Sequence, residues 1–546
     1  MVYNAKSAND DQFTILLNGQ RELEQQLIEI QKACDLSVQH RRKRVKKRYY
    51  NLALMAKVVC HTTTEEVKRL IINGTKSLLI DAVTNTLEDV ENIYTMIKNT
   101  IKDLQTEDPT THLVVGIALE ITGDSCRIGR LRNDCSIFVK KGDIMTLTTD
   151  ANYKYSSFKE ICYVINLVHY LPSLALSEEI KIGNEVHGHI VKKLKGSIAF
   201  QVNSPGIINS YEYIDFLKSC HSLDMHVFQL MFTQDLELAA KINTDFVVIS
   251  NIRWKPLLKV MHHHIKYLYN FKLIGTLDLA NGSAKKLDTL GIVKLLDFIW
   301  LPNLFTLSKS MQTYVCKDVI PVAKYLKKPI IGSVPLERCS DFHIFENHDF
   351  LWKIDCIFIE KSTWCNKYPL IVKKLLPIRD FRRGVVDNPK ALLEILTSHQ
   401  SVVNFIIRTI SSIECQAIFL YTKCETAAAA LGRVEIYCPV YVLLSMDETD
   451  EVTQKQVQLA KVLNLRRNLS SILYYKKTNL CEYKPIDFGL EYARASGHIE
   501  TGDFVITIEV GKWGVEDTLH LGVDEDVVIM RAFYVAPMNV CEKFKC

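Results

Sequence analysis

Polar side chains stand where two short apolar runs of this sequence end. Ser250 and Arg253 follow one run, and Thr276 and Asp278 stand at the end of another. Guanidinium and hydroxyl groups bind anions, and carboxylate oxygens bind hard cations such as magnesium. If both runs are strands of one parallel barrel, these groups gather at its active-site rim and could hold a small anion. The alternative for Arg253 is an ion pair with a local carboxylate that stabilises the rim.

Three consecutive histidines, His262, His263 and His264, offer a second possible chemistry. The surrounding pattern predicts a helix over residues 256–268, in which consecutive side chains point about 100° apart. Because three such side chains cannot easily share one metal ion, a solvated helix face is favoured over a metal site.

Eight short apolar runs, rich in valine and isoleucine, are typical of strands that are buried on both faces of a sheet. They cover residues 54–60, 77–80, 112–119, 245–249, 272–277, 297–301, 329–333 and 355–359. Helical patterns lie between most of them, at 64–72, 86–104, 256–268, 284–290 and 311–326. This alternation predicts an α/β protein built on a (β/α)8 TIM barrel.

The alternation is interrupted between the third and fourth runs, which predicts further domains. Residues 121–205 show β-type stretches with turn signals, as an inserted, barrel-like β domain would. The TIM barrel is therefore expected at 51–120 and 206–386, after an N-terminal extension at 1–50. Residues 387–546 alternate helical and strand patterns, which predicts a C-terminal α/β domain with an open sheet.

A basic run, HRRKRVKKR, occupies residues 40–48. One interpretation is a nuclear-import signal or a site for an acidic partner. The other is a solvated helix face that leads into the barrel, and it is favoured because the run is short and isolated.

The composition is that of an ordinary globular protein. Of 546 residues, 48% are hydrophobic and 24% are charged, and the formal net charge of +5 is too small to predict nucleic-acid or membrane binding. No apolar run approaches the roughly 18–20 residues of a transmembrane helix, and residues 1–13 lack a secretory pattern. The 16 cysteines show no CxxC pair, so we expect reduced thiols in a cytoplasmic protein.

Five segments resemble motifs of the pyruvate kinase family and occur in the family's order. They are residues 116–129, 245–253, 328–331, 355–369 and 502–506. The first, GIALEITGDSCRIG, is similar to the family's ALDTKGPEIRTG, and the fourth, DCIFIEKSTWCNKYP, is similar to DCIMLSGETAKGDYP without a gap. A barrel, a β insertion and a C-terminal α/β domain also follow one another in pyruvate kinases.

The resemblance implies the family's glycolytic reaction, in which a phosphoryl group passes from phosphoenolpyruvate to ADP and gives pyruvate and ATP. It also implies magnesium and potassium as cofactors, a homotetramer or other homo-oligomer, and the cytoplasm, with no nucleic-acid or membrane partner. Charge develops on several oxygens during such a transfer, so catalysis depends on fixed cations and hydrogen-bond donors around the phosphoryl group.

At the catalytic positions that the resemblance implies, this chain differs from the family. Thr276 stands at the position of the catalytic lysine, and Phe305 stands at the position of a magnesium-binding aspartate. A phenyl ring cannot coordinate magnesium. Asp278 keeps a carboxylate at the other magnesium position, one carbon shorter than the family's glutamate. The remaining matches to substrate-binding or nucleotide-binding residues are Arg127, Ser250 and Arg253.

The resemblance also places a substrate arginine and the ligands of a monovalent cation on the second and third runs. Leu79 stands at the arginine position, and Asp81 and Val83 stand at the asparagine and serine positions. Glu120 and Ile121 stand at the positions of an aspartate and a threonine. Since two hydroxyl ligands are lost, potassium binding is expected to be lost or badly weakened.

These substitutions predict a pyruvate kinase-like protein that has lost or severely weakened catalysis and acts by binding, assembly or regulation. The first alternative is an active pyruvate kinase with substituted residues, but the candidate Lys272 lies four strand positions, about 13 Å, from Thr276. The second alternative is a different enzyme for small anions at the same rim, and no new set of histidines, cysteines or carboxylates supports it.

Overall fold

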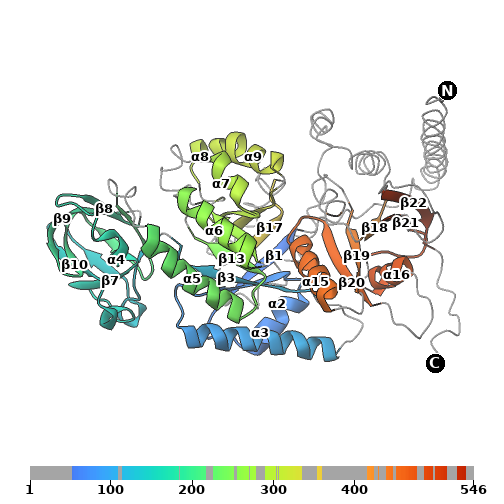
Figure 1. The fold of residues 1–546 in the computed structure, drawn as a ribbon, viewed down its shortest axis with the longest axis horizontal. Coiled ribbons are helices and arrows are strands. Elements are labelled where there is room, and N and C mark those ends of the chain that lie inside the picture. Colours follow the sequence, from blue (N-terminus) through green and yellow to red (C-terminus); the bar gives the residue numbers. More distant parts are fainter. Residues whose placement is uncertain are drawn as a thin grey trace, which may run out of the picture. The chain divides into compact units, whose positions relative to one another are not determined.

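The computed structural model of the chain describes its residues in several ranges. They are 52–107, 114–123, 125–183, 185–216, 225–250, 252, 255–269, 271–277, 289–302, 304, 307–326, 328–334, 353–359, 415–422, 428, 438–446, 450–475, 485–495, 498–512 and 526–535. The chain forms two compact units, one spanning Leu54–Tyr368 and a second that includes Pro369–Cys546. Figure 1 shows the elements of both units, coloured along the sequence.

The first unit is built on a closed barrel of parallel strands. In spatial order these are β1 (Ala53–Val58), β17 (Cys356–Ile359), β16 (Ile330–Val334), β15 (Phe298–Leu301), β14 (Lys272–Thr276), β13 (Phe246–Ile249), β3 (Gly116–Ile121) and β2 (Ser77–Asp81). Most of their residues are buried, which explains the apolar runs without alternation. Each predicted run overlaps one of these strands, so the predicted (β/α)8 barrel is confirmed.

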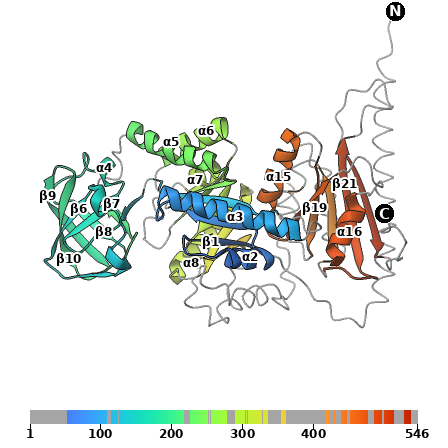
Figure 2. The same cartoon turned by 90° about the horizontal axis from the view of Figure 1, so that it is seen from below.

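Helices surround this barrel. They are α2 (Thr64–Ile72), α3 (Leu87–Glu107), α5 (Met225–Lys241), α6 (Lys255–Leu268), α7 (Thr289–Leu295), α8 (Lys309–Tyr314) and α9 (Ile320–Tyr325). α3 packs against α2 and β2 on one side (Figure 2). α2 begins with a capping box, because Thr63 and Glu66 each accept a hydrogen bond from the other's backbone N–H. One π-helical turn joins α8 to α9, where Pro321 offers no N–H.

An aspartate repeats at the amino ends of the barrel strands. Asp245, Asp297 and Asp355 each precede a strand. Each carboxylate accepts the N–H of the first or second residue of the neighbouring strand: Ile117 at 2.8 Å, Leu273 at 2.9 Å and Ile330 at 2.9 Å. The backbone N–H of each aspartate donates in turn to the carbonyl of the same residue. This reciprocal pair fixes the register of β3 to β13, of β14 to β15 and of β16 to β17.

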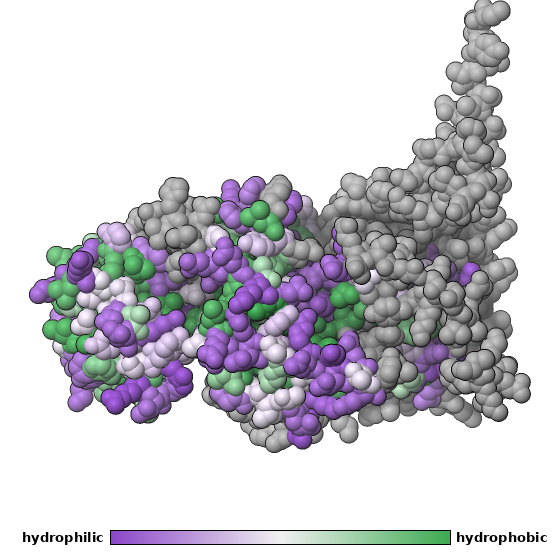
Figure 3. All heavy atoms as spheres, turned by 60° about the horizontal axis from the view of Figure 1, so that its bottom comes forward, coloured by the Kyte–Doolittle hydropathy of each residue, from purple (hydrophilic) through white to green (hydrophobic). Residues whose placement is uncertain are grey.

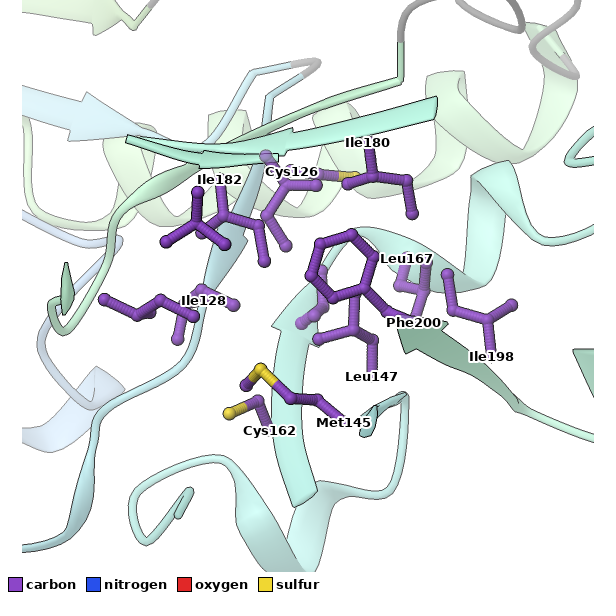
Figure 4. Close-up of a cluster of buried hydrophobic side chains, with 14 of the residues drawn as sticks. Cys126, Ile128, Met145, Leu147, Cys162, Leu167, Ile180, Ile182, Ile198 and Phe200 are labelled. Carbon is purple, nitrogen blue, oxygen red and sulfur yellow. The ribbon is translucent and has the colours of Figure 1, made fainter. Parts of the chain in front are cut away.

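The inserted β domain is a second, smaller closed barrel. Its strands are β4 (Cys126–Ile128), β6 (Ile144–Thr148), β7 (Ile161–Ile165), β8 (Glu179–Ile182), β9 (Val186–Leu194), β10 (Ser197–Ser204) and β12 (Tyr213–Phe216). β5 (Ile137–Val139) and β11 (Gly206–Ile208) form a separate ribbon. Inward side chains of the small barrel form one apolar core around Phe200 and Leu147 (Figure 4).

The second unit contains an open sheet of five strands. β20 (Leu469–Tyr475), β19 (Val440–Met446), β18 (Ala417–Thr422) and β21 (Phe504–Lys512) are parallel, and β22 (Asp526–Tyr534) adds an antiparallel edge. α15 (Asp450–Asn464) and α16 (Pro485–Ala495) pack on this sheet. The open α/β sheet agrees with the predicted fold class, whereas the predicted domain boundaries stay predictions. Residues 391–410, in the first part of the predicted C-terminal domain, lie outside the described residues.

The visible surface mixes polar and apolar side chains. On the face shown in Figure 3, apolar residues are interspersed with hydrophilic ones over the β domain and the barrel. Such a mixture is normal for a protein surface. Within the described ranges, no helix has the length and apolar character needed to cross a membrane.

The aspartate motif gives a stability prediction. Asp297→Ala removes the charge-assisted hydrogen bond to the N–H of Leu273, and we expect the free energy of unfolding to fall by about 1.5–3 kcal/mol. Asp318→Ala, at an exposed position of the π-helical turn, should change it by less than about 0.5 kcal/mol. Urea unfolding followed by circular dichroism measures both. Equal losses in the two variants would show that the motif does not hold the strands.

A carboxyl group in α5 gives a pH prediction. Burial raises the pKa of half-buried Asp235 to about 7, although its carboxylate accepts the backbone N–H of Thr122. The folded chain therefore keeps a proton that an unfolded carboxyl releases near pH 4, and this group's contribution to stability falls as the pH rises from about 4 to 7.

Asp235→Asn, which resembles the neutral carboxyl, is expected to remove this dependence and to be more stable than the wild type above pH 7. Urea unfolding at several pH values between 4 and 8 measures the difference, with the exposed Glu237→Gln as a control. Parallel profiles of the wild type and Asp235→Asn contradict the prediction.

Candidate active site

The carboxyl ends of the barrel strands, here called the rim, carry a layer of side chains on one face of the sheet. Side chains alternate along a strand, and parallel neighbours in register share a face. The register pairs are Lys57 with Leu79, Asp81 with Glu120, Thr276 with Trp300, and Ser333 with Phe358. The layer therefore has a charged half on β1, β2 and β3 and an aromatic half on β14 to β17.

An ion pair between β1 and β2 dominates the charged half. Lys57 Nζ lies 2.6 Å from Asp81 Oδ2, and the side chains are 23% and 2% exposed. Burial opposes the ammonium charge, but Asp81 and Glu120 outweigh it and raise the pKa of Lys57 above its usual value. Burial likewise opposes ionisation of Asp81, yet Lys57 and Thr84 hold the pKa of that carboxyl below its usual range. Both groups are therefore charged at neutral pH.

The oxygens of Asp81 are fully used by the protein. Oδ1 accepts the backbone N–H groups of Val83 at 2.8 Å and Thr84 at 3.1 Å. Oδ2 accepts the hydroxyl of Thr84 at 2.8 Å and the ammonium of Lys57 at 2.6 Å. A carboxylate offers about four lone-pair sites, so these donors occupy all of them.

Glu120 is the second carboxylate of the rim, and it holds two of the residues that the sequence singled out. The buried Ser250 hydroxyl donates a hydrogen bond to Glu120 Oε1. Arg127 Nη2 lies 3.5 Å from the same oxygen, and both of these charged side chains are buried. Ser250 and Arg127 therefore lie together at the rim, but a carboxylate of the protein already binds them.

Arg127 also joins the rim to the β domain. Its Nη2 donates to the hydroxyl of Tyr213 at 2.8 Å, and its guanidinium lies over the ring of Tyr213 at 4.3 Å. Arg127 Nε is buried and has no hydrogen-bond partner within the described part of the chain. Gly123 begins the passage into β4 with a φ of +61°, where a Cβ atom would lie 2.8 Å from Ile249 Cγ2. The fold thus fixes the path that brings Arg127 to the rim.

The other half of the rim layer is filled by neutral and aromatic groups. Thr276 ends β14 and is buried, at the position where the resemblance implies a lysine. The ring centroids of Trp300 and Phe358 lie 4.3 Å apart, and Trp300 Nε1 donates to the hydroxyl of Ser333 at 2.7 Å. These groups bring no formal charge to the ends of β14 to β17.

The residues available for the two implied cofactors, potassium and magnesium, differ. Potassium does not fit the residues present, because the oxygens of Asp81 are taken by Lys57 and three other donors. For magnesium, the positions named by the sequence, Asp278 and Phe305, lie outside the described residues. Elsewhere in the described ranges, no three histidine, cysteine or acidic side chains gather closely enough to hold a metal ion.

The remaining sequence predictions for the site have different outcomes. Arg253 also lies outside the described ranges. Lys272 lies at the amino end of β14, at the opposite end of the strand from Thr276. Two of the three histidine rings face backbone carbonyls: His262 Nδ1 lies 2.8 Å from the oxygen of Leu295, and His264 Nδ1 lies 3.1 Å from that of Val260.

Sequence reasoning missed Lys57. Leu79 marks the loss of an arginine from β2, but its register partner on β1 is this lysine. The available signal was a single charged residue in the otherwise apolar strand ALMAKV. A cation is therefore present at the rim on the neighbouring strand.

Among known proteins, the chain has a distant relative. No protein-family model matches the chain. Pyruvate kinase 2 of Saccharomyces cerevisiae is 20% identical over 454 residues, which cover 77% of this chain and 84% of the yeast protein. This similarity supports a pyruvate kinase-like family for the chain. The closed barrel with additional domains agrees with that family.

The pair between Arg127 and Glu120 gives a stability prediction for the rim. Arg127→Met leaves a buried carboxylate without its cation, so we expect the free energy of unfolding to fall by about 3–5 kcal/mol. Arg130→Met breaks the exposed pair with Asp134 nearby and should cost less than about 1 kcal/mol. Urea unfolding at neutral pH compares the two variants, and a smaller loss for Arg127→Met than for Arg130→Met would refute this account of the pair.

Proposed function

We propose that this pyruvate kinase-like chain has lost, or retains only weakly, phosphoryl transfer from phosphoenolpyruvate to ADP, and that it acts by binding, assembly or regulation. The observation that carries the proposal is the pairing of rim cations with carboxylates of the protein: Lys57 with Asp81, and Arg127 with Glu120. Phosphoryl transfer needs cations whose charge is directed at the transferring group. Here the four charges sum to zero before any substrate arrives.

The neutral half of the rim supports the same proposal. In a pyruvate kinase, the resemblance implies a lysine at the position of Thr276 and a magnesium ligand at that of Phe305. A hydroxyl and a phenyl ring supply neither an ammonium nor a metal-binding carboxylate. The loss of one such stabilising group costs about 10²–10³-fold in turnover. Two losses therefore predict very weak catalysis or none.

A second candidate function is an active pyruvate kinase with substituted residues, and one observation favours it. Arg127 Nε is a buried donor that has no partner within the described part of the chain, and it could bind an oxygen of a substrate. Phosphoenolpyruvate, ADP and magnesium would then be its ligands, as in the related enzymes. Potassium would not be required, since the residues do not fit it.

A coupled assay separates the two candidates. The full chain is mixed with phosphoenolpyruvate, ADP, magnesium and potassium, and pyruvate is measured through lactate dehydrogenase. Yeast pyruvate kinase 2 serves as the positive control in the same buffer. We expect turnover at least about 10³-fold below that of the yeast enzyme, because at least one essential cation is absent. Turnover within tenfold of the yeast enzyme would instead establish an active kinase.

A homo-oligomer and a cytoplasmic location also belong to this proposal. Both rest on the similarity to pyruvate kinases. An assembled but inactive chain could act as a binding or regulatory subunit, which is the role proposed here.

A further inference from the structure

We propose that the ammonium group of Lys57 occupies the place of a monovalent cation at the rim, so that the folded chain carries a permanent, covalently tethered cation there and does not take up potassium. The inference concerns the source of positive charge beside the carboxylate of Asp81. It is therefore separate from whether the chain turns over a substrate.

The starting point is a pair of neighbouring carboxylates. Asp81 and Glu120 are register partners on adjacent strands, so their side chains leave the same face of the sheet. Both residues are buried. Two buried carboxylates side by side repel each other and lose hydration, and such a pair needs a cation if both are to stay ionised.

Lys57 supplies the cation for Asp81 from the next strand, while Arg127 pairs with Glu120. Lys57 Nζ lies 2.6 Å from Asp81 Oδ2, close enough for a charge-assisted hydrogen bond. The charge of Glu120 also favours the ammonium form of Lys57. An ammonium group has the single charge of a potassium ion and, like it, interacts with several oxygens at once.

The remaining contacts leave no oxygen of Asp81 for a second cation. Its four lone-pair sites accept Val83 N, Thr84 N, the Thr84 hydroxyl and Lys57 Nζ. Glu120 Oε1 is bound by the hydroxyl of Ser250 and faces Arg127. A potassium ion entering here would have to displace the ammonium and would meet a second cation, the guanidinium.

Thermal unfolding in two salts tests the inference. The melting temperature of the full chain is measured in potassium chloride and in tetramethylammonium chloride, whose cation is too large for such a site, at the same ionic strength of about 0.1 M. The wild type is expected to melt at the same temperature, within about 1 °C, in both salts.

Lys57→Met keeps most of the apolar stem and removes the charge. This variant is expected to melt lower in tetramethylammonium chloride and to regain stability in potassium chloride, with a gain that rises with the logarithm of the potassium concentration. Lys68→Met is the matched control, since Lys68 forms a 2.6 Å pair with Glu107 at the surface. Its melting temperature should be the same in the two salts.

Two results overturn the inference. One is a potassium-specific stabilisation of the wild type, which would mean that the rim binds the ion in spite of Lys57. The other is a folded Lys57→Met variant that responds equally to both salts, which would mean that the ammonium does not replace an ion. If Lys57→Met does not fold, Lys57→Gln is measured in its place, and the wild-type comparison decides on its own. Because the readout is unfolding, neither result depends on turnover.

Discussion

The ion pair between Lys57 and Asp81 sets the character of the rim. A buried carboxylate is stable only when a cation or several donors compensate for lost hydration, and Asp81 has both. The same requirement at Glu120 is met by Arg127 and Ser250. In another protein, such cations could bind a substrate. Here they pair with carboxylates of the chain and link β1 to β2 and β3 to β4. The rim is therefore a place where the protein binds its own side chains.

The barrel and its inserted domain could be predicted from the sequence, but the side-chain contacts at the rim could be predicted only in part. Strands buried on both faces show themselves as apolar runs, and eight runs interrupted once specify the barrel and the insertion. Partnerships across strands leave no such pattern. Arg127 and Ser250 lie at the rim, but nothing in the sequence shows that Glu120 holds both of them.

Lys57 is a second residue whose contact across strands could not be predicted from the sequence. A motif comparison matches residues position by position. Leu79, at the position of an arginine, therefore indicates that β2 has lost a cation. The barrel, however, places Lys57 beside Leu79 in register, and a charge moved to a neighbouring strand stays close in space. Asp245, Asp297 and Asp355, at the opposite end of the barrel, fall within the predicted strands. Their hydrogen bonds to the neighbouring strands could not be predicted from the sequence. Register decides both cases, and register is a property of the folded sheet.

The central claim is that a self-neutralised rim does not attract a small, highly charged anion. Isothermal titration of phosphoenolpyruvate into the full chain, with magnesium and potassium present, tests it most directly. We predict no saturable heat at millimolar ligand, because the carboxylates already neutralise Lys57 and Arg127. Binding of one molecule per chain with a micromolar Kd would contradict the account and would show that these cations remain available to a substrate.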